Sequence, residues 1–374
     1  MKQQSCFKFN LIKKCSESNA RAGVFETPHG TVNTPVFMPV GTNSAVKMMT
    51  QDHLYNTQAE IILSNSYHLF LRPGHKLIEK AGGLHKWMNW QKPVLTDSGG
   101  FQIFSLSDLR SLTEEGVTFK DAKGGNTYFI SPEISMKIQN SLGADIIMAF
   151  DECAPYPCSY NQAKEAMERT HRWLFRCLES NERQDQALFP IVQGSVYDDL
   201  RTESAKVISN IDAHGYAIGG VSVGEPKELK NHIIELTTPF LPANKPRYLM
   251  GVGTPEDLLD GVLRGIDMFD CVMPTRIARH GCFFTPYGRK IIKNKEFEED
   301  FSPLVEECEC YACKNHSRAY IRHLYRVKEA TAGILMTIHN IFYLVKLMQD
   351  ARNAVLEGYF PEFYRDRMNL LNIL

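Results

Sequence analysis

The stretch PVLTDSGGFQIFS, residues 93–105, begins with a short apolar run and continues with a carboxylate, two glycines, an aromatic ring and an amide. A turn would need only one glycine and no charge. A continuous apolar run of this kind is typical of a strand in a parallel sheet that is buried on both faces. In such folds the loop that follows a strand carries the chemistry, so Asp97 is a candidate functional residue.

Similar runs recur along the chain, and segments with helical signals separate them. The eight runs are PVFMPV (35–40), IILSN (61–65), PVLTD (93–97), DIIMAFD (145–151), FPIVQG (189–194), YAIGG (216–220), RYLMG (247–251) and MFDCVM (268–273). Eight strands that alternate with helices predict a (β/α)8 barrel, for which about 250 residues is a usual size. An open doubly wound sheet is the alternative that this pattern leaves open.

Signals for helix ends support the helical segments. Ser131 and Pro132 supply an N-cap and a first-turn proline, and Gly143 is suited to end that helix. Ser159 and Gln162 have the spacing of a capping box, which predicts a second helix start.

The composition is that of a large soluble protein. Of the 374 residues, 43% are hydrophobic and 23% are charged, with a formal net charge of −1. Nucleic-acid binding, if present, must therefore come from local patches. The most lipid-like segment, 331–348, contains His339, Asn340 and Lys346, so we expect it inside the protein and not in a membrane. The N-terminal sequence lacks the apolar core of a signal peptide, and we expect a cytoplasmic location.

The sequence CECYAC places Cys308, Cys310 and Cys313 within six residues. Clustered thiols in a chain without an export signal favour zinc over disulfides, although a chance group of free cysteines is the alternative. Structural zinc takes four nitrogen or sulfur ligands, so one more is needed. His316 is near in sequence, whereas His339 lies on a predicted helix that can approach from another direction, and we favour His339. Four protein ligands leave no open position, so the predicted zinc is structural.

Three aspartates, Asp97, Asp151 and Asp270, end predicted barrel strands. Each alone could be a helix cap or an ion-pair partner. Two carboxylates beside a sugar carbon can instead act as nucleophile and as acid–base group in glycosidic chemistry. Phe101 offers a stacking face for a flat ligand.

Two further features fit a nucleotide ligand. Gln193, Asp151 and the amides of Gly219–Gly220 offer groups that can read the edge of a purine. Residues 276–295 contain six basic residues and no acid. Such a run is often only a solvated face, but beside an acidic pocket it predicts a track for phosphates.

The chain resembles the tRNA-guanine transglycosylases (queuine tRNA-ribosyltransferases) over nearly its whole length. The motifs that carry this resemblance occur in the family's order and are TDSGGFQ, FDECAPYP, IVQGS, YAIGGVSVGEP, YLMGVGTPED, FDCVMPTRIAR and CECYAC with the later His339. The resemblance implies a modified TIM barrel with an inserted C-terminal zinc subdomain. It also implies exchange of guanine at the tRNA wobble position for a 7-deazaguanine, without a redox or nucleotide cofactor.

The resemblance also implies a role for each matching residue. Asp270 matches the nucleophile that attacks the ribose anomeric carbon, and Asp97 matches the general acid/base. Asp151 and Gln193 match residues that read the base edge, with backbone contacts from Gly220. The remaining matches are Phe101 and Met250 for the two faces of the base slot, Arg276 and Arg279 for the flanking nucleotides, and Cys308, Cys310, Cys313 and His339 for zinc.

Other details of the resemblance indicate the bacterial type, which takes 7-aminomethyl-7-deazaguanine. Val223 and Cys153 resemble that type, whereas eukaryotic catalytic subunits, which take queuine, tend to differ there. Glu225 is then expected in the pocket wall near the aminomethyl group. A chain ending at Leu374 leaves no room for the RNA-binding domains of archaeal members, and the family habit implies a homodimer. The rival functions are a non-catalytic tRNA-binding subunit and a zinc-dependent TIM-barrel hydrolase.

The sequence therefore predicts three parts. Antiparallel strands in residues 1–34 cap the barrel, residues 35–295 form the catalytic barrel, and residues 296–374 form the zinc-binding subdomain with the closing C-terminal helices. Residues 282–293 are expected to form a hairpin.

Overall fold

The computed structural model describes residues 6–106, 111–121 and 125–371. Parallel strand segments form one barrel sheet, in the order β11-β10-β6-β5-β4-β15-β14-β13-β12. Their bounds are β4 (Val36–Gly41), β5 (Ile62–Ser64), β6 (Val94–Thr96), β10 (Ile146–Met148), β11 (Ala187–Phe189), β12 (Ile191–Val192), β13 (Tyr216–Ile218), β14 (Arg247–Leu249) and β15 (Met268–Cys271). All the predicted barrel strands are present, and most end earlier than predicted because their polar ends belong to the following loops.

Pro190 explains why the sheet has nine segments instead of eight strands. β11 pairs with β10 and β12 pairs with β13, while Pro190 alone separates β11 from β12. Proline has no N–H to donate, so the strand is interrupted and its two halves pair with different neighbours. β11 and β12 are the two ends of the strand order, and together they correspond to the fifth predicted strand, so this strand brings the two ends of the sheet together. This closure confirms the TIM-type (β/α)8 barrel and rules out the open doubly wound sheet.

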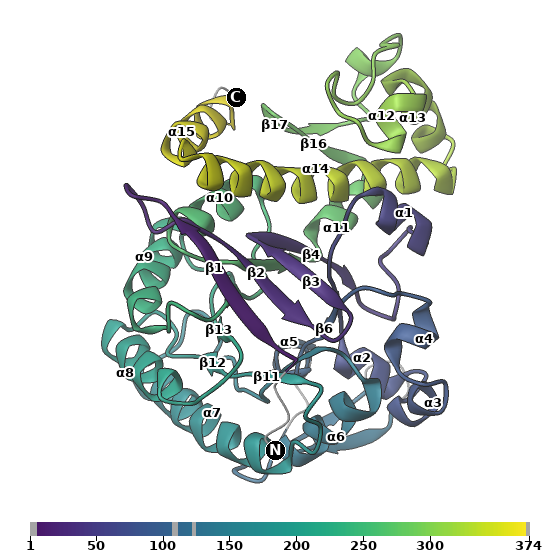
Figure 1. Cartoon of the computed structure of the whole chain (residues 1–374). Helices are drawn as coiled ribbons and strands as arrows, with labels where there is room; N and C mark the ends of the chain where they lie inside the picture. The colour runs from purple at the N-terminus through teal and green to yellow at the C-terminus, as the bar shows by residue number, and fades with distance from the viewer. Residues whose placement is uncertain (1–5, 107–110, 122–124, 372–374) are drawn as a thin grey trace.

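Helices surround the barrel strands (Figure 1). In chain order they are α1 (Gln51–Asn56), α2 (Ser66–Leu71), α3 (His75–Lys80), α4 (Leu84–Met88), α5 (Gly100–Leu106), α6 (Pro132–Leu142), α7 (Tyr160–Ser180), α8 (Asp198–Ser209), α9 (Lys227–Thr237), the 3-10 turn Thr238–Phe240, α10 (Pro255–Leu263) and α11 (Met273–Arg279). The predicted helix ends are confirmed, since Ser131 caps α6 and Gly143 ends it with a φ of 72°. The capping box of Ser159 and Gln162 begins α7.

A three-stranded antiparallel sheet lies across one end of the barrel (Figure 1). It consists of β1 (Lys8–Lys14), β2 (Arg21–Thr27) and β3 (Gly30–Thr34). Its side chains Phe9, Phe25 and Val32 share one buried cluster with Met38 and Leu95 of the barrel strands. The sheet therefore closes that end of the barrel with apolar contacts. Residues 1–5, where the segment considered for a signal peptide begins, lie outside the described residues.

A second small antiparallel sheet was not predicted. It consists of β7 (Ser111–Leu112), β8 (Val117–Lys120) and β9 (Thr127–Ile130) and lies in the chain between the third and fourth barrel strands. Val117 and Ile130 are buried in the main core, which anchors this sheet to the barrel.

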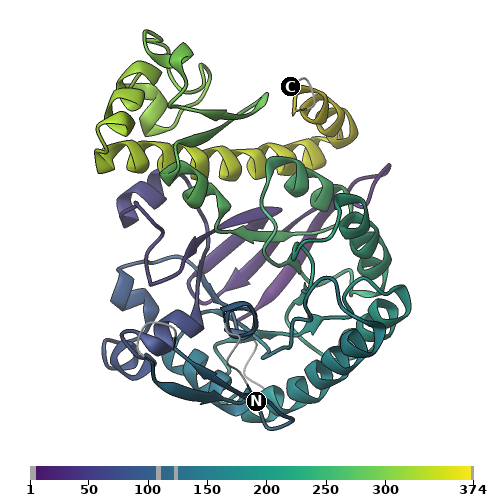
Figure 2. The ribbon, with the colours of Figure 1, turned by 180° about the vertical axis from the view of Figure 1, so that it is seen from behind.

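The C-terminal part contains the predicted hairpin and a long helix. Its elements are β16 (Cys282–Thr285), β17 (Gly288–Ile291), the 3-10 turn Lys295–Phe297, α12 (Tyr311–Asn315), α13 (Arg318–Arg326), α14 (Ala330–Glu357) and α15 (Phe360–Leu371). Both ribbon views show α14 beside the barrel, with α12 and α13 near one end of it, the β16–β17 hairpin over its middle and α15 near the other end (Figures 1 and 2). The division of the chain after residues 34 and 295 stays a prediction.

Helix α14 is the one helix in the described part of the chain that is long and apolar enough to cross a membrane. Within its most apolar window, 78% of the residues are buried inside the protein. Such burial is typical of the core helix of a soluble protein, as the polar residues within this segment predicted.

Candidate active site and metal centre

A cavity of about 590 Å³ lies at the carboxyl ends of the barrel strands. The predicted site residues that line it are Asp97, Phe101, Asp151, Gln193, Gly220, Met250, Asp270, Arg276 and Arg279. Six strands deliver most of them, because the carboxyl ends of parallel strands meet at the same end of a barrel. Cys153 and Val223, which indicated the bacterial type, line the same cavity. Glu225 is not among its lining residues.

Asp97 is buried directly after β6, where two groups donate hydrogen bonds to its carboxylate. The backbone N–H of Ser66 donates to Oδ1 over 2.8 Å, and the side-chain amide of Asn65 donates to Oδ2. Burial raises the pKa of Asp97 to about 7, the Ser66 amide opposes this rise, and the nearby charges of Asp270 and Asp151 add to it. A pKa near neutrality suits a group that must both donate and accept a proton.

Replacing Asp97 by asparagine should stabilise the protein at pH 8 and have little effect at pH 4. The pKa of Asp97 is about 7 in the folded protein, against an ordinary value of 3.8 in an unfolded chain. Between pH 4 and pH 7, therefore, Asp97 is protonated in the folded protein and ionised in the unfolded chain. The folded protein loses stability as the pH rises through this range, because the buried carboxyl must give up its proton. We expect a gain of about 1–4 kcal/mol in the free energy of unfolding at pH 8, measured by denaturant titration at both pH values.

Asp145→Asn is the matched control for this pH effect, because that buried carboxylate has the opposite shift. Burial alone would raise its pKa, but hydrogen bonds from His29, His85 and the Val94 amide bring it down to about 2. Its contribution to stability is therefore present above pH 4 and is lost as the pH falls through 2. Asp145→Asn should be destabilising at pH 8. Equal destabilisation by Asp97→Asn at pH 8 would contradict the raised pKa of Asp97.

Asp270 lies in β15 with one carboxylate oxygen held by two donors. The hydroxyl of Tyr248 and the backbone N–H of Gly251 each donate to Oδ1 over 2.7 Å. Oδ2 accepts no hydrogen bond from the described residues, and the carboxylate faces the cavity. Burial raises the pKa of Asp270, and the bonds from Tyr248 and Gly251 oppose that rise. The arrangement orients one oxygen and leaves the other for a ligand.

Asp151 and Gln193 contact each other at the base of the cavity. The Gln193 amide donates to Asp151 Oδ2 over 2.8 Å, and the Ser98 hydroxyl donates to Oδ1 over 3.1 Å. Burial raises the pKa of Asp151 to about 6, while these two donors lower it. Gly100 is packed so closely that a Cβ there would lie 2.6 Å from the Asp151 carbonyl oxygen. Together these groups offer donors and acceptors in a fixed arrangement.

The cavity also has an open, cationic side. Phe101 is 49% exposed although it lines the cavity, so its ring is available for stacking. Met250 lies after β14 and lines the cavity as well. Arg276 and Arg279 are exposed on α11, the helix that directly follows β15. A ligand with a flat ring and flanking phosphates fits this combination of surfaces.

The carboxylate of Glu225 is engaged with its own loop. It accepts hydrogen bonds from the backbone N–H groups of Ser222 and Val223, the latter over 2.9 Å. Val223 lines the cavity, so Glu225 is connected to the site only indirectly, by its hydrogen bonds within this loop. Its predicted place in the pocket wall stays a prediction.

Sequence reasoning did not identify Tyr248, Ser98 or Arg201 as site residues. Tyr248 lies inside an apolar run, where its hydroxyl gives no signal that distinguishes it from a core aromatic residue. Ser98 follows Asp97 directly and could have been noticed as a polar residue at a strand end. Arg201 lies on α8, where an arginine ordinarily indicates a solvated helix face.

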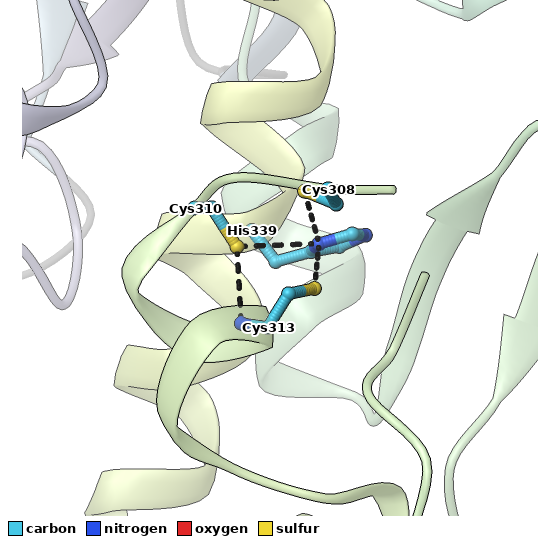
Figure 3. A group of neighbouring side chains, drawn as sticks. All are labelled: Cys308, Cys310, Cys313 and His339. Carbon is cyan, nitrogen blue, oxygen red and sulfur yellow. Dashed lines mark hydrogen bonds between the residues drawn. The ribbon is translucent and has the colours of Figure 1, made fainter. Parts of the chain in front are cut away.

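The side chains of Cys308, Cys310, Cys313 and His339 form one group (Figure 3). The three Sγ atoms lie 3.6, 3.6 and 3.3 Å from His339 Nδ1. His339 Nε2 lies 2.8 Å from the Phe284 carbonyl oxygen, so Nε2 carries the proton and Nδ1 is free to bind a metal. The donor set therefore fits a metal ion with four protein ligands. The histidine in the group is His339, which the sequence favoured, and not His316.

Comparison with known proteins supports the resemblance seen in the motifs. The model of the queuine tRNA-ribosyltransferase family matches residues 15–372. The queuine tRNA-ribosyltransferase of Caldanaerobacter subterraneus subsp. tengcongensis is 58% identical over 360 residues, which cover 96% of each chain. Those of Halothermothrix orenii and Halalkalibacterium halodurans are 58% and 56% identical, covering 95% of this chain and 95% and 94% of their own. These matches span almost the entire chain, and it belongs to the queuine tRNA-ribosyltransferase family of enzymes.

Proposed function

We propose that this protein is a pentosyltransferase that exchanges guanine at the tRNA wobble position for 7-aminomethyl-7-deazaguanine, in queuosine biosynthesis. The observation that carries the proposal is the cavity in which Asp97, Asp151 and Asp270 meet with raised pKa values, in a chain of this family. The proposal includes tRNA as the macromolecular substrate, a cytoplasmic location and a homodimer.

The guanine base must leave the anticodon stack before it can react. Phe101 and Met250 would hold its two faces, and Asp151, Gln193 and the Gly220 backbone would bind its polar edge. Arg276 and Arg279 would contact the phosphates or bases on either side of it. Bound in this way, the nucleotide would have its ribose beside Asp270 and Asp97.

Exchange then takes two displacements at the ribose anomeric carbon. Oδ2 of Asp270 forms a bond to this carbon as the bond to guanine breaks, and Asp97 gives a proton to the departing base. The incoming base gives a proton to Asp97 as its nitrogen displaces Asp270. Two inversions preserve the anomeric configuration, and the covalent ester keeps the tRNA bound between them.

We propose that the Cys308, Cys310, Cys313 and His339 group holds one zinc ion. Three thiolates and one imidazole are a ligand set that structural zinc prefers. When bound, the ion would fix the fold of the C-terminal part; it supplies no step of the exchange, because the group does not line the cavity.

The experiment that tests this function is base exchange into unmodified tRNA that carries guanine at the wobble position. Labelled guanine and the aminomethyl precursor should be incorporated, and queuine should be a much poorer substrate. The same tRNA with adenine at the wobble position should incorporate none of them. Binding of tRNA without incorporation would favour the non-catalytic subunit, and metal-dependent hydrolysis without exchange would favour the hydrolase.

A further inference from the structure

Arg201 is fully buried on α8, and its guanidinium donates only to backbone carbonyl groups in the parts of the chain that are described. Nε donates over 2.7 Å to Ser195, Nη1 over 3.1 and 2.8 Å to Val192 and Gly219, and Nη2 over 2.9 Å to Gly220. A buried charge is unfavourable unless several groups compensate it. Burial lowers the pKa of Arg201 to about 10, so the group is still charged at neutral pH.

The four carbonyl groups belong to the carboxyl ends of two neighbouring strands, β12 and β13, and to the loops that follow them at the cavity. Val192 ends β12 and Ser195 lies in the loop that follows it, on either side of Gln193, while Gly219 and Gly220 follow β13. These loops are in close contact, since a Cβ on Gly220 would lie 2.3 Å from the side-chain oxygen of Gln193. Arg201 itself does not line the cavity and holds the two loops together from behind.

The carbonyl contacts also fix the direction of the neighbouring N–H groups. In a planar trans peptide the C=O and N–H bonds point in opposite directions. Because the carbonyl groups of Gly219 and Gly220 point at Arg201, the N–H groups of Gly220 and Val221 point away from it. Gly220 and Val221 both line the cavity. The buried cation thus orients two peptide dipoles with their positive ends toward the ligand.

We propose that Arg201 is a positioning residue for the exchanged base, which sets the Gly220 and Val221 N–H groups to face an acceptor such as a purine carbonyl oxygen. The proposal rests on the proposed function, because the base is the one exchanged there. It predicts that Arg201 affects the binding of the base and not the binding of tRNA.

The test compares Arg201→Lys with Arg247→Lys. Arg247 is also buried and also donates to carbonyl groups, those of Leu241 and Gly265, but it begins β14 at the opposite end of the barrel from the cavity. Lysine keeps the charge and cannot span four carbonyl groups. Both variants should be less stable than the unmodified protein. Only Arg201→Lys should raise the KM for guanine, by about tenfold or more, with the KM for tRNA and the kcat within about threefold.

An unchanged guanine KM in folded Arg201→Lys, or an equal rise in Arg247→Lys, would overturn the proposal. Arg201→Gln is the second variant if the lysine variant does not fold. If neither Arg201→Lys nor Arg201→Gln folds, Arg201 has a structural role only, and the proposal is likewise overturned. Failure of the proposed function is a separate result, in which the unmodified protein exchanges no base. Guanine binding by calorimetry would then compare the unmodified protein with Arg201→Lys, and equal affinity would overturn the positioning role.

Discussion

Asp270→Asn should lower base exchange by at least about four orders of magnitude and abolish the covalent RNA adduct. The amide is a very poor nucleophile, so the first displacement cannot occur. Asparagine has the same size, and its carbonyl oxygen can accept the hydrogen bonds that Tyr248 and Gly251 now donate to Oδ1. The substitution therefore removes the chemistry and keeps the geometry. Incorporation of labelled guanine and a denaturing gel of the tRNA–protein mixture measure the two effects.

The stability of Asp270→Asn separates a catalytic role from a structural one. Burial raises the pKa of Asp270, so loss of its charge should not lower the unfolding temperature. Asp145→Asn serves again as the control, because this carboxylate is buried, is bonded to His29 and His85, and does not line the cavity. The Asp145→Asn variant should be less stable than the unmodified protein, and it should keep its base-exchange activity when assayed well below its unfolding temperature. Near-normal exchange by Asp270→Asn would show that another group is the nucleophile.

The barrel could be predicted because its strands are buried on both faces. Such strands appear in the sequence as continuous apolar runs, and Asp97, Asp151 and Asp270 stand out as the charges that end them. The interruption at Pro190 was not predicted, since the run FPIVQG gives no sign that its two halves pair with different strands. The sheet of β7, β8 and β9 was missed because its strands are short and only partly buried, so their periodicity is weak.

The residues that support the site from behind could not be predicted, because tertiary contacts alone define them. Tyr248 is a core tyrosine until β14 and β15 pair and bring its hydroxyl to Asp270. Arg201 is an ordinary helical arginine until two loops place carbonyl groups around it. Glu225 was identified from the sequence, but the neighbours that its carboxylate contacts depend on the conformation of its own loop.

Cys310→Ala should lose zinc and bind tRNA more weakly, while the barrel keeps its structure. Cys310 Sγ lies 3.6 Å from His339 Nδ1 and also accepts the Cys313 N–H that caps α12. In zinc-finger peptides the metal contributes about 10–16 kcal/mol to folding, so loss of one ligand should destabilise this part severely. The group belongs to a buried cluster that is separate from the two clusters of the barrel. Metal analysis and thermal unfolding should show a zinc-free protein with an early, partial transition.

Weaker tRNA binding follows from a direct connection between the metal group and the basic helix. Asn340, next to His339 on α14, donates hydrogen bonds to the carbonyl groups of Pro274 on α11 and Cys282 on β16, each over 3.1 Å. Since α11 carries Arg276 and Arg279, movement of this part of α14 should displace both arginines. Cys282→Ala is the matched control, because this cysteine lies on β16, which Asn340 also contacts, and outside the metal group. It should keep zinc and tRNA affinity, whereas a full equivalent of zinc in Cys310→Ala would mean that the ligand set is wrong.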